Sequence, residues 1–206
     1  MYDTLHLCYD FVDNDRPNTN DIIYKLNEVS YAEFSGGSTC TYGNLDNLRI
    51  CIREGELSIK GSLPKYYYGN NFQTLSQKTT SEAIEKLSDD LNLDVNLCRV
   101  TRIDLSTNFI TTYKPNIYYD YLGNLKRFNR LENPHSIDYR QKSKKLLFYD
   151  KVMWAKQTRS LIPLEFQNKN VLRYEMVLNE AVKRCLKLNK ITMQDLHGDS
   201  MYSRLV

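Results

Sequence analysis

Two stretches of the chain read as hairpins, and the first of them alternates clearly between apolar and polar residues. In the first, Leu48 to Gly61 (LRICIREGELSIKG), two alternating runs flank Arg53-Glu54-Gly55-Glu56. In the second, Ser136 to Gln141 and Lys145 to Asp150 flank a turn at Lys142-Ser143-Lys144. Alternation with a period of two is typical of strands that bury one face, and short polar connections join antiparallel neighbours. The sequence therefore predicts a largely antiparallel sheet.

Further strands and several helices are expected along the rest of the chain. Strand-like runs occur at Thr4–Phe11, Cys98–Ile110 and Val171–Leu178, whereas Ser62–Phe72 (SLPKYYYGNNF) shows neither period and is expected to be a loop. Caps and apolar faces predict helices over Ile22 to Val29 after Asn18-Thr19-Asn20, from Thr79-Thr80-Ser81 to Leu91, from Asn116 to Leu125 after Pro115, from about Glu180 to Leu188, and from Met193. This mixture predicts an α+β fold, with helices packed on a mainly antiparallel central sheet.

Length and composition limit the organisation of the chain. Its 206 residues, 41% of them apolar, are enough for one compact domain or two small halves that share a core. The sequence has no apolar run long enough to span a membrane and no secretory start, so we expect a cytoplasmic protein without a membrane partner. The five cysteines form no CxxC pair, which favours reduced core thiols over a disulfide framework and argues against zinc.

Positive charge is concentrated in one part of the chain, while the net charge is only +3. Residues 126–156 carry nine lysines and arginines against three acidic residues, with tyrosines and a tryptophan between them. Such a surface suits phosphates and unstacked bases, although an ordinary solvated hairpin can have the same composition. A second basic and aromatic stretch, Lys65 to Asn70, can clamp single-stranded DNA or can be a packed aromatic loop. The candidate DNA-binding residues are Lys65, Tyr67, Arg102, Arg140, Lys142, Lys144, Lys145 and Arg173.

Two strand-like segments carry the same pattern of arginine, apolar residue, acid and apolar residue. Arg102 and Asp104 share one face of the first, and Arg173 and Glu175 share one face of the second, because side chains two residues apart lie on the same side of a strand. If the two strands are neighbours, Asp104 and Glu175 can converge on Mg²⁺ or Mn²⁺, which prefer carboxylate oxygens. The alternative is a lattice of arginine and acid pairs that only solvates one face of the sheet.

The second hairpin places Tyr139 on one arm and Tyr149, followed by Lys151, on the other. A tyrosine that attacks a phosphodiester forms a phosphotyrosyl enzyme and needs a Lewis acid and a basic group to stabilise the charge. The basic groups on the hairpin are Lys142, Lys144, Lys145 and Lys151. A hairpin tyrosine is a packing residue in most proteins, so this pattern alone leaves its role open.

Five short motifs follow one another along nearly the whole sequence. They are GSLPKYYYGNN, EAIEKLSDDLNL, RVTRIDLSTNF, SIDYRQKSKKLLFYDK, and VLRYEMVLN followed by ITMQDL. In this order they resemble the filamentous-phage gene II/X family of phage and plasmid replication proteins. The chain is also similar, more distantly, to rolling-circle plasmid initiators, whose pattern is an R-I-D strand, a tyrosine-bearing hairpin ending in Y-D-K, and an R-x-E strand.

This resemblance implies site- and strand-specific nicking at a replication origin through a covalent 5′-phosphotyrosyl intermediate, with rejoining after a round of synthesis. Asp104 and Glu175 match the acidic strand positions and would hold the divalent metal, Mg²⁺ or Mn²⁺, with Asp3 as a candidate third ligand. The implied partners are single-stranded or supercoiled origin DNA and the host helicase and polymerase, in the cytoplasm of a bacterial host cell.

The resemblance also ranks the tyrosines. Tyr139 matches the hairpin tyrosine and is the first choice of nucleophile, and Tyr149 is the second. Lys151, in the Y-D-K match, would be a phosphate-side base or charge stabiliser.

One feature of many rolling-circle nickases is missing, the His-hydrophobe-His pair that holds their metal. This chain has only His6, His135 and His197, which are isolated from one another. The expected fold is therefore a replication-initiator nickase type (HUH-like, Rep) without that motif, in a single catalytic domain spanning residues 1–206 that can be the N-terminal part of a longer protein. The competing interpretation is a non-catalytic origin-binding or copy-control module of the same fold. Both would bind DNA, but only the enzyme would form a covalent adduct.

Overall fold

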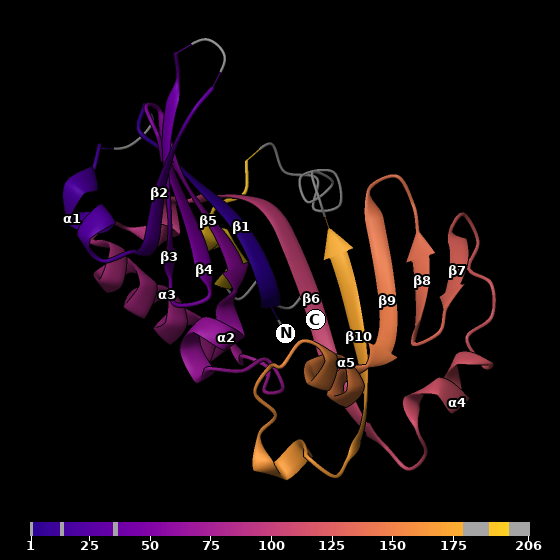
Figure 1. Cartoon of the computed structure of the whole chain (residues 1–206). Helices are drawn as coiled ribbons and strands as arrows, with labels where there is room; N and C mark the ends of the chain where they lie inside the picture. The colour runs from indigo at the N-terminus through magenta and orange to yellow at the C-terminus, as the bar shows by residue number, and fades with distance from the viewer. Residues whose placement is uncertain (1, 13–14, 35–36, 179–189, 198–206) are drawn as a thin grey trace.

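A single antiparallel sheet organises the chain in the computed structural model, which describes residues 2–12, 15–34, 37–178 and 190–197 (Figure 1). The ten described strands follow the order β2-β3-β4-β5-β1-β6-β10-β9-β8-β7. The strands are β1 (Tyr2–Asp10), β2 (Asn27–Glu33), β3 (Thr39–Leu45), β4 (Leu48–Arg53), β5 (Glu56–Ser62), β6 (Arg99–Thr111), β7 (Asn129–Asn133), β8 (Ser136–Arg140), β9 (Lys144–Asp150) and β10 (Asn170–Leu178). The expected α+β class with a mainly antiparallel sheet is confirmed.

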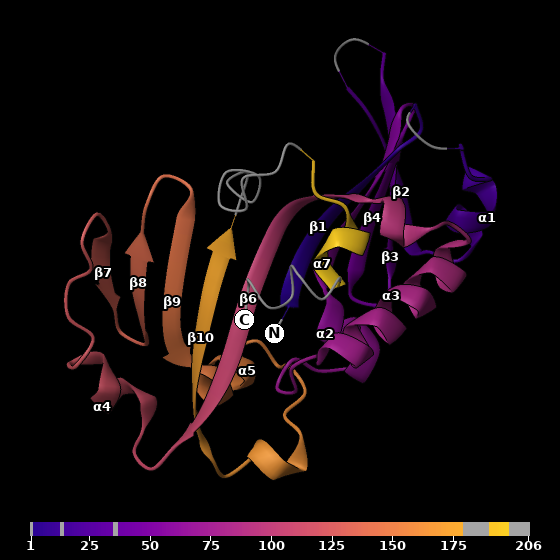
Figure 2. The ribbon, with the colours of Figure 1, turned by 180° about the vertical axis from the view of Figure 1, so that it is seen from behind.

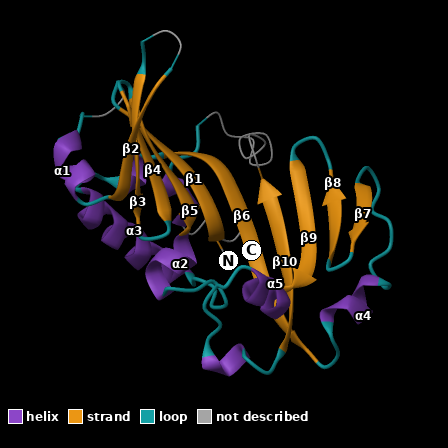
Figure 3. Cartoon of the chain, in the orientation of Figure 1, coloured by secondary structure: helices purple, strands orange, loops and turns teal. Residues whose placement is uncertain are grey.

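The described helices are fewer and mostly short (Figure 3). They are α1 (Thr19–Tyr24), α2 (Leu63–Tyr68), α3 (Gln77–Leu91), α4 (Pro115–Tyr119), α5 (Lys151–Gln157) and α7 (Met193–His197), with short 3-10 helices η1 (Val95–Leu97) and η2 (Leu164–Phe166). None of these helices is both long enough and apolar enough to cross a membrane.

The helices divide between the two faces of the sheet. Viewed from behind, α3 and α7 lie in front of the strands, and α5 lies on the far side (Figure 2). The largest buried apolar cluster joins α3 and α7 to the strands of the N-terminal half, with side chains such as Leu5, Ile59 and Ile84. Smaller clusters hold α5 against Val171 and α4 against Tyr139, on opposite faces of the C-terminal half. Alternation in the strands decides which face each side chain serves.

Both hairpins expected from the alternating pattern form, as β4–β5 and β8–β9. The expected strands at the N-terminus, at Cys98–Ile110 and at Val171–Leu178 also form, as β1, β6 and β10. The helix expected to start at Thr79 to Ser81 starts at Gln77, because the side chain of Ser76 accepts a hydrogen bond from the backbone of Thr79. The helix expected at Glu180 to Leu188 lies outside the described residues.

Other expectations were wrong for local reasons. Residues 62–72 contain helix α2 rather than a loop only, because Ser62 caps its first turn and Gly69 ends it with a φ of 75°. The helix expected to reach Val29 ends at Tyr24, and the one expected to reach Leu125 ends at Tyr119. The strands β2 and β7 escaped detection because nearly all their residues are exposed, so no buried face imposes alternation.

The expectation of reduced thiols holds for only part of the cysteine set. Cys40 on β3 and Cys51 on β4 form a disulfide between adjacent strands, with their Cα atoms 6.6 Å apart. Cys8 and Cys98 are free and buried. Sequence spacing could not reveal the disulfide, because the pairing depends on the register of β3 against β4.

Candidate functional site

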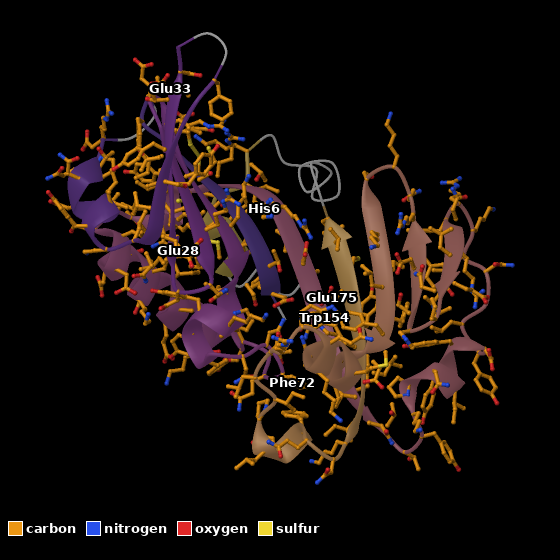
Figure 4. The ribbon with its side chains drawn as sticks, in the orientation of Figure 1. His6, Glu28, Glu33, Phe72, Trp154 and Glu175 are labelled. Atoms are coloured by element: carbon orange, nitrogen blue, oxygen red, sulfur yellow. A yellow bond between two sulfur atoms is a disulfide. The ribbon has the colours of Figure 1, made fainter. Side chains whose placement is uncertain are left out.

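A cavity of about 570 Å³ opens on the face of the sheet that carries α5. Its walls come from β1, β6, β8, β9 and β10, from the ends of β5 and β7, and from residues of α2 and α5. Figure 4 shows Glu175 and Trp154, which both line it, close together where α5 meets the sheet. The polar and aromatic lining residues include Asp3, Ser62, Lys65, Asn71, Arg102, Asp104, His135, Asp138, Lys145, Tyr149, Trp154 and Glu175.

The register of β6 and β10 brings the two expected acidic strands together. These strands pair directly, with Val177 opposite Asp104 and Glu175 opposite Ser106. Glu175 is two residues from Val177, so it lies on the same face as Asp104, on the diagonal. The condition for convergence, that the two strands are neighbours in the sheet, is therefore met by their pairing.

Arg173 joins carboxylates from two strands into one buried network. Its side chain is only 1% exposed. Its Nε donates to Oε1 of Glu175 at 2.6 Å, and its Nη2 donates to Oδ2 of Asp3 at 2.6 Å and to Oγ of Ser106 at 2.9 Å. Burial alone would raise the pKa of Asp3, but Arg173 and the hydrogen bond from Ser62 hold it below its usual value.

Asp104 has a different environment. Both of its oxygens accept hydrogen bonds from Arg102, at 2.7 Å and 2.6 Å. Its pKa is nevertheless raised, because burial and the nearby charges of Glu175 and Asp3 outweigh the stabilising effect of Arg102. Negative charge is therefore concentrated on this side of the cavity beyond what its arginines neutralise.

Tyr149 lies beside this acidic group. It pairs with Arg173 across β9 and β10, and its hydroxyl donates to Oε1 of Glu175 at 2.7 Å. Burial is the largest influence on the Tyr149 pKa and raises it, and Glu175 raises it further, while Arg173 opposes both. The phenol is thus protonated at neutral pH and already directed at a carboxylate that can accept its proton.

Tyr139 is not brought to the carboxylates. It pairs with Leu146 across β8 and β9, one residue out of step with the positions that face the cavity. Its ring is buried against α4, and its hydroxyl donates to the backbone oxygens of Leu122 and Gly123. Successive residues of a strand point to opposite faces of the sheet. Tyr139 packs on the face that carries α4, whereas Tyr149 points into the cavity on the other face.

Lys151 lies behind the cavity wall and does not line the cavity. Its side chain is fully buried, and its Nζ donates to Oδ1 of Asn71 at 2.6 Å and lies over the ring of Trp154. Burial, with help from the charge of Arg173, lowers its pKa to about 7. Contact between this amine and a phosphate would require the wall to move.

The expected DNA-binding residues separate into three groups. Lys65, Arg102 and Lys145 line the cavity, although Arg102 pairs with Asp104 and Lys145 pairs with Asp138. Arg173 is buried in the network with Glu175 and Asp3. The remaining expected residues, which are not among the residues that line this cavity, are Tyr67, Arg140, Lys142 and Lys144.

Several cavity residues were missed in the sequence. Asp138 precedes Tyr139 in the hairpin motif, so the two side chains point to opposite faces of the sheet. Asp138 faces the cavity. Its carboxylate accepts a hydrogen bond from Arg140 and forms an ion pair with Lys145. Asn71 and Trp154 carried no comparable signal, because one is in a loop and the other in a helix that the sequence did not predict.

The acidic side of the cavity has the donor chemistry that Mg²⁺ or Mn²⁺ prefers, since Asp104, Glu175 and Asp3 offer carboxylate oxygens. Burial, with the neighbouring charges of Glu175 and Asp3, raises the pKa of Asp104, and a bound cation would stabilise its charged form. Within the described ranges, however, no three histidine, cysteine or acidic side chains are gathered closely enough to hold a metal ion. His6 does not complete the set, because it lies away from Glu175, further along β1 (Figure 4).

Comparisons with known proteins agree with the motifs that run along the chain. A family model that describes the N-terminal region of a phage replication-associated protein matches residues 1–196. No curated protein matches the chain.

Proposed function

Because the chain belongs to the family defined by the N-terminal region of a phage replication-associated protein, we propose that it nicks and rejoins DNA at a replication origin with Tyr149 as its nucleophile. The family supports a role in phage replication. The observation that carries the finer proposal is the hydrogen bond from the Tyr149 hydroxyl to Glu175, 2.7 Å long, inside a cavity that also holds Asp104. Tyr139 donates to backbone oxygens instead, so Tyr149 replaces it as our choice of nucleophile.

The proposed reaction is the transfer of a phosphodiester to the tyrosine. As the Tyr149 oxygen forms a bond to phosphorus, the bond from phosphorus to the 3′ oxygen breaks, and that oxygen leaves with the electron pair and takes up a proton from water. The phenol proton passes to Glu175, its hydrogen-bond acceptor in the structure. The product is a 5′-phosphotyrosyl enzyme and a free 3′-hydroxyl, and reversal of the same steps rejoins the strand.

Charge on the phosphate would be stabilised by the cations that line the cavity. Lys65 is well suited to this task, because its ammonium group lies 5.5 Å from the centre of the Trp154 ring at the cavity wall. Arg102 and Lys145 also line the cavity, but each already pairs with an aspartate. Lys151 would act from behind the wall by positioning Asn71 rather than by touching the phosphate.

We propose that Asp104 and Glu175 hold a divalent cation, with Asp3 as the third candidate, although these side chains would have to move closer together than they lie in the described structure. Bound there, Mg²⁺ or Mn²⁺ would polarise the phosphate as a Lewis acid. The fold would then be a relative of the HUH-like nickases that uses carboxylates in place of the histidine pair. The DNA partner would be single-stranded or supercoiled origin DNA, with the host helicase and polymerase acting afterwards.

The competing function is origin binding without chemistry. It is favoured by one observation, the complete engagement of both Asp104 oxygens by Arg102. Both functions predict salt-sensitive binding of DNA, so only a covalent product separates them.

The test is to incubate the protein with end-labelled, overlapping single-stranded oligonucleotides from its own replicon, with Mn²⁺ or with EDTA, and to separate the products on a denaturing protein gel. We expect a shifted, metal-dependent band with the wild-type protein and none with Tyr149→Phe. That substitution removes the attacking oxygen and little packing.

Tyr139→Phe is the matched control, because it removes a hydroxyl from the same hairpin on the other face of the sheet. It should keep the covalent band. A band that disappears in Tyr139→Phe but persists in Tyr149→Phe would overturn the assignment, and no band in any protein that still binds DNA would support the non-catalytic module. A band that survives EDTA, or survives in Asp104→Asn, would contradict the proposed metal site.

A further inference from the structure

A second cavity of about 580 Å³ adjoins the first. Pro134, His135, Asp150 and Met153 line both of them. These four residues come from the β7–β8 turn and from the junction of β9 with α5. Because the cavities share this boundary, an extended chain bound in one can continue into the other. We call the second cavity the flanking groove.

The flanking groove differs from the first cavity in charge. Lys114, Lys156 and Lys169 line it, and they come from three separate segments: the start of α4, helix α5 and the turn before β10. Among its described lining residues, Asp150 alone is acidic. That carboxylate is already engaged, since Oδ1 accepts a hydrogen bond from the backbone of Met153 at the start of α5.

The three lysines are exposed and are not neutralised within the described part of the chain. None of them takes part in an ion pair there, whereas Lys145 in the first cavity pairs with Asp138. The first cavity is rich in carboxylates, with those of the buried network and Asp104 among its lining residues. An anionic polymer would therefore find its favourable contacts in the flanking groove, on one side of the acidic cavity.

The remaining lining groups suit a nucleotide chain. Asn116, Gln167 and Asn168 line the groove with amide groups that can both donate and accept hydrogen bonds. Tyr119 also lines the groove, but it is buried, and its hydroxyl donates to the backbone oxygen of His135 at the boundary. Lysines for phosphates combined with amides suit a groove that follows the backbone of a single strand.

We propose that the flanking groove binds the stretch of single-stranded DNA next to the phosphodiester held at Tyr149. The inference rests on the proposed function for the identity of the strand. Lys114, Lys156 and Lys169 contact consecutive backbone phosphates, and the shared boundary at His135 directs the strand into the first cavity. The groove thereby fixes which bond of the strand reaches the tyrosine.

The first test measures binding alone. Fluorescence anisotropy with a labelled oligothymidylate compares the wild-type protein with a variant carrying Lys114→Ala, Lys156→Ala and Lys169→Ala, both in the Tyr149→Phe background, so that no covalent product forms. We expect the triple variant to bind about tenfold more weakly or worse. The slope of log affinity against log salt should fall by about 2, because each lost contact to single-stranded DNA removes about 0.7.

The control variant removes the same charge from the helical layer, with Lys25→Ala, Lys78→Ala and Lys86→Ala around α1 and α3. It should keep the wild-type affinity and slope within about twofold. Equal loss in both variants would show that only net charge matters and would overturn the groove. Equal sensitivity of a duplex oligonucleotide to the groove variant would overturn the assignment to single strands.

The second test distinguishes failure of this inference from failure of the proposed function. Origin oligonucleotides are shortened from one side or the other of the nick, and the covalent band is followed against DNA concentration. We expect shortening on one side to weaken wild-type binding and to have little further effect on the triple variant, while the band at saturating DNA is unchanged. Binding that depends on the groove without any band would reject the nickase and keep the groove, whereas a normal band with unaltered concentration dependence would reject the groove.

Discussion

Arg173 holds carboxylates that line the cavity in place, although it does not itself line the cavity. It is the hub of the buried network, since it holds Glu175 from β10 and Asp3 from β1 while its Nη1 donates to the backbone oxygen of Asn71. Lysine could not replace it, because a single ammonium group lacks the planar fork that reaches several acceptors at once. The sequence pattern indicated a DNA contact for Arg173, but its burial shows that it holds the carboxylates in place.

Lys151 should make the stability of the protein depend on pH, because burial lowers the pKa of its side chain. Its pKa in the folded protein is about 7, below its usual value of 10.5. Between these pH values the unfolded chain holds a proton that the folded chain has lost, so the free energy of unfolding rises with pH across this window. Below about pH 7 the group is protonated in both states and contributes no further slope.

Lys151→Met should therefore flatten the rise in unfolding free energy between about pH 7 and about pH 10. Urea denaturation at several pH values measures it, and Lys156→Met, an exposed lysine in the same helix, is the control and should keep the wild-type slope. If the Lys151→Met slope equals that of the wild-type protein, the lysine is not buried in the uncharged form.

Helix α2 connects local sequence to the site at the scale of an element. The Ser62 side chain accepts from the backbone of Lys65, which caps the helix, and its hydroxyl donates to Oδ1 of Asp3 at 2.6 Å. The same residue thus starts the helix that carries Lys65 and holds an acid of the buried network.

Ser62→Ala should lower the free energy of unfolding by about 1–3 kcal/mol, since it removes a cap and leaves a buried carboxylate oxygen with one donor fewer. Chemical denaturation measures the change. Ser58→Ala, in the same strand, provides the control and should change stability by less than about 1 kcal/mol. Similar losses in both variants would show that the cap and the bond to Asp3 contribute little.

The elements that could be predicted from the sequence are those with strand-like apolar runs or clear turn signals. They include the β4–β5 and β8–β9 hairpins, β6 and β10, which supply Asp104, Glu175 and Tyr149. The choice between Tyr139 and Tyr149 could not be predicted, because both lie in alternating strands and only the register against β10 decides which one faces the acids. The flanking groove could not be predicted from the sequence either, since its lysines come from three segments that tertiary packing alone brings together.

At the scale of the whole molecule, stability is distributed unevenly along the sheet. The largest buried cluster covers β1, β4, β5 and β6 on the helical side and includes Leu178 at the end of β10, whereas two small clusters around Val171 and Tyr139 hold the rest of the C-terminal half. The edge strand β7 is almost wholly exposed. Local opening requires less free energy where fewer apolar contacts are broken, so β7 and β8 should open before β1 and β6 do.

Native-state hydrogen exchange measures this difference amide by amide. We expect the amides of β1, β5 and β6 to exchange only through global unfolding, and those of β7 and β8 to exchange faster through partial opening. Ile137→Ala, in the cluster under β8, should speed exchange in β7–β9 with little effect on β1. Leu57→Ala, in the large cluster, should instead lower global stability by about 2–5 kcal/mol.

Uniform protection across all ten strands would show that the sheet opens as one cooperative unit. The expected gradient has a functional consequence, because β9 carries Tyr149 and lies between the loosely held hairpin arm and the strand that carries Glu175. A β7–β8 arm that can open while β6 and β10 stay closed would admit a DNA strand past Pro134 and His135 without disturbing the carboxylates. Ile137→Ala should then increase the rate of DNA association more than it changes the rate of dissociation, a difference that stopped-flow anisotropy resolves.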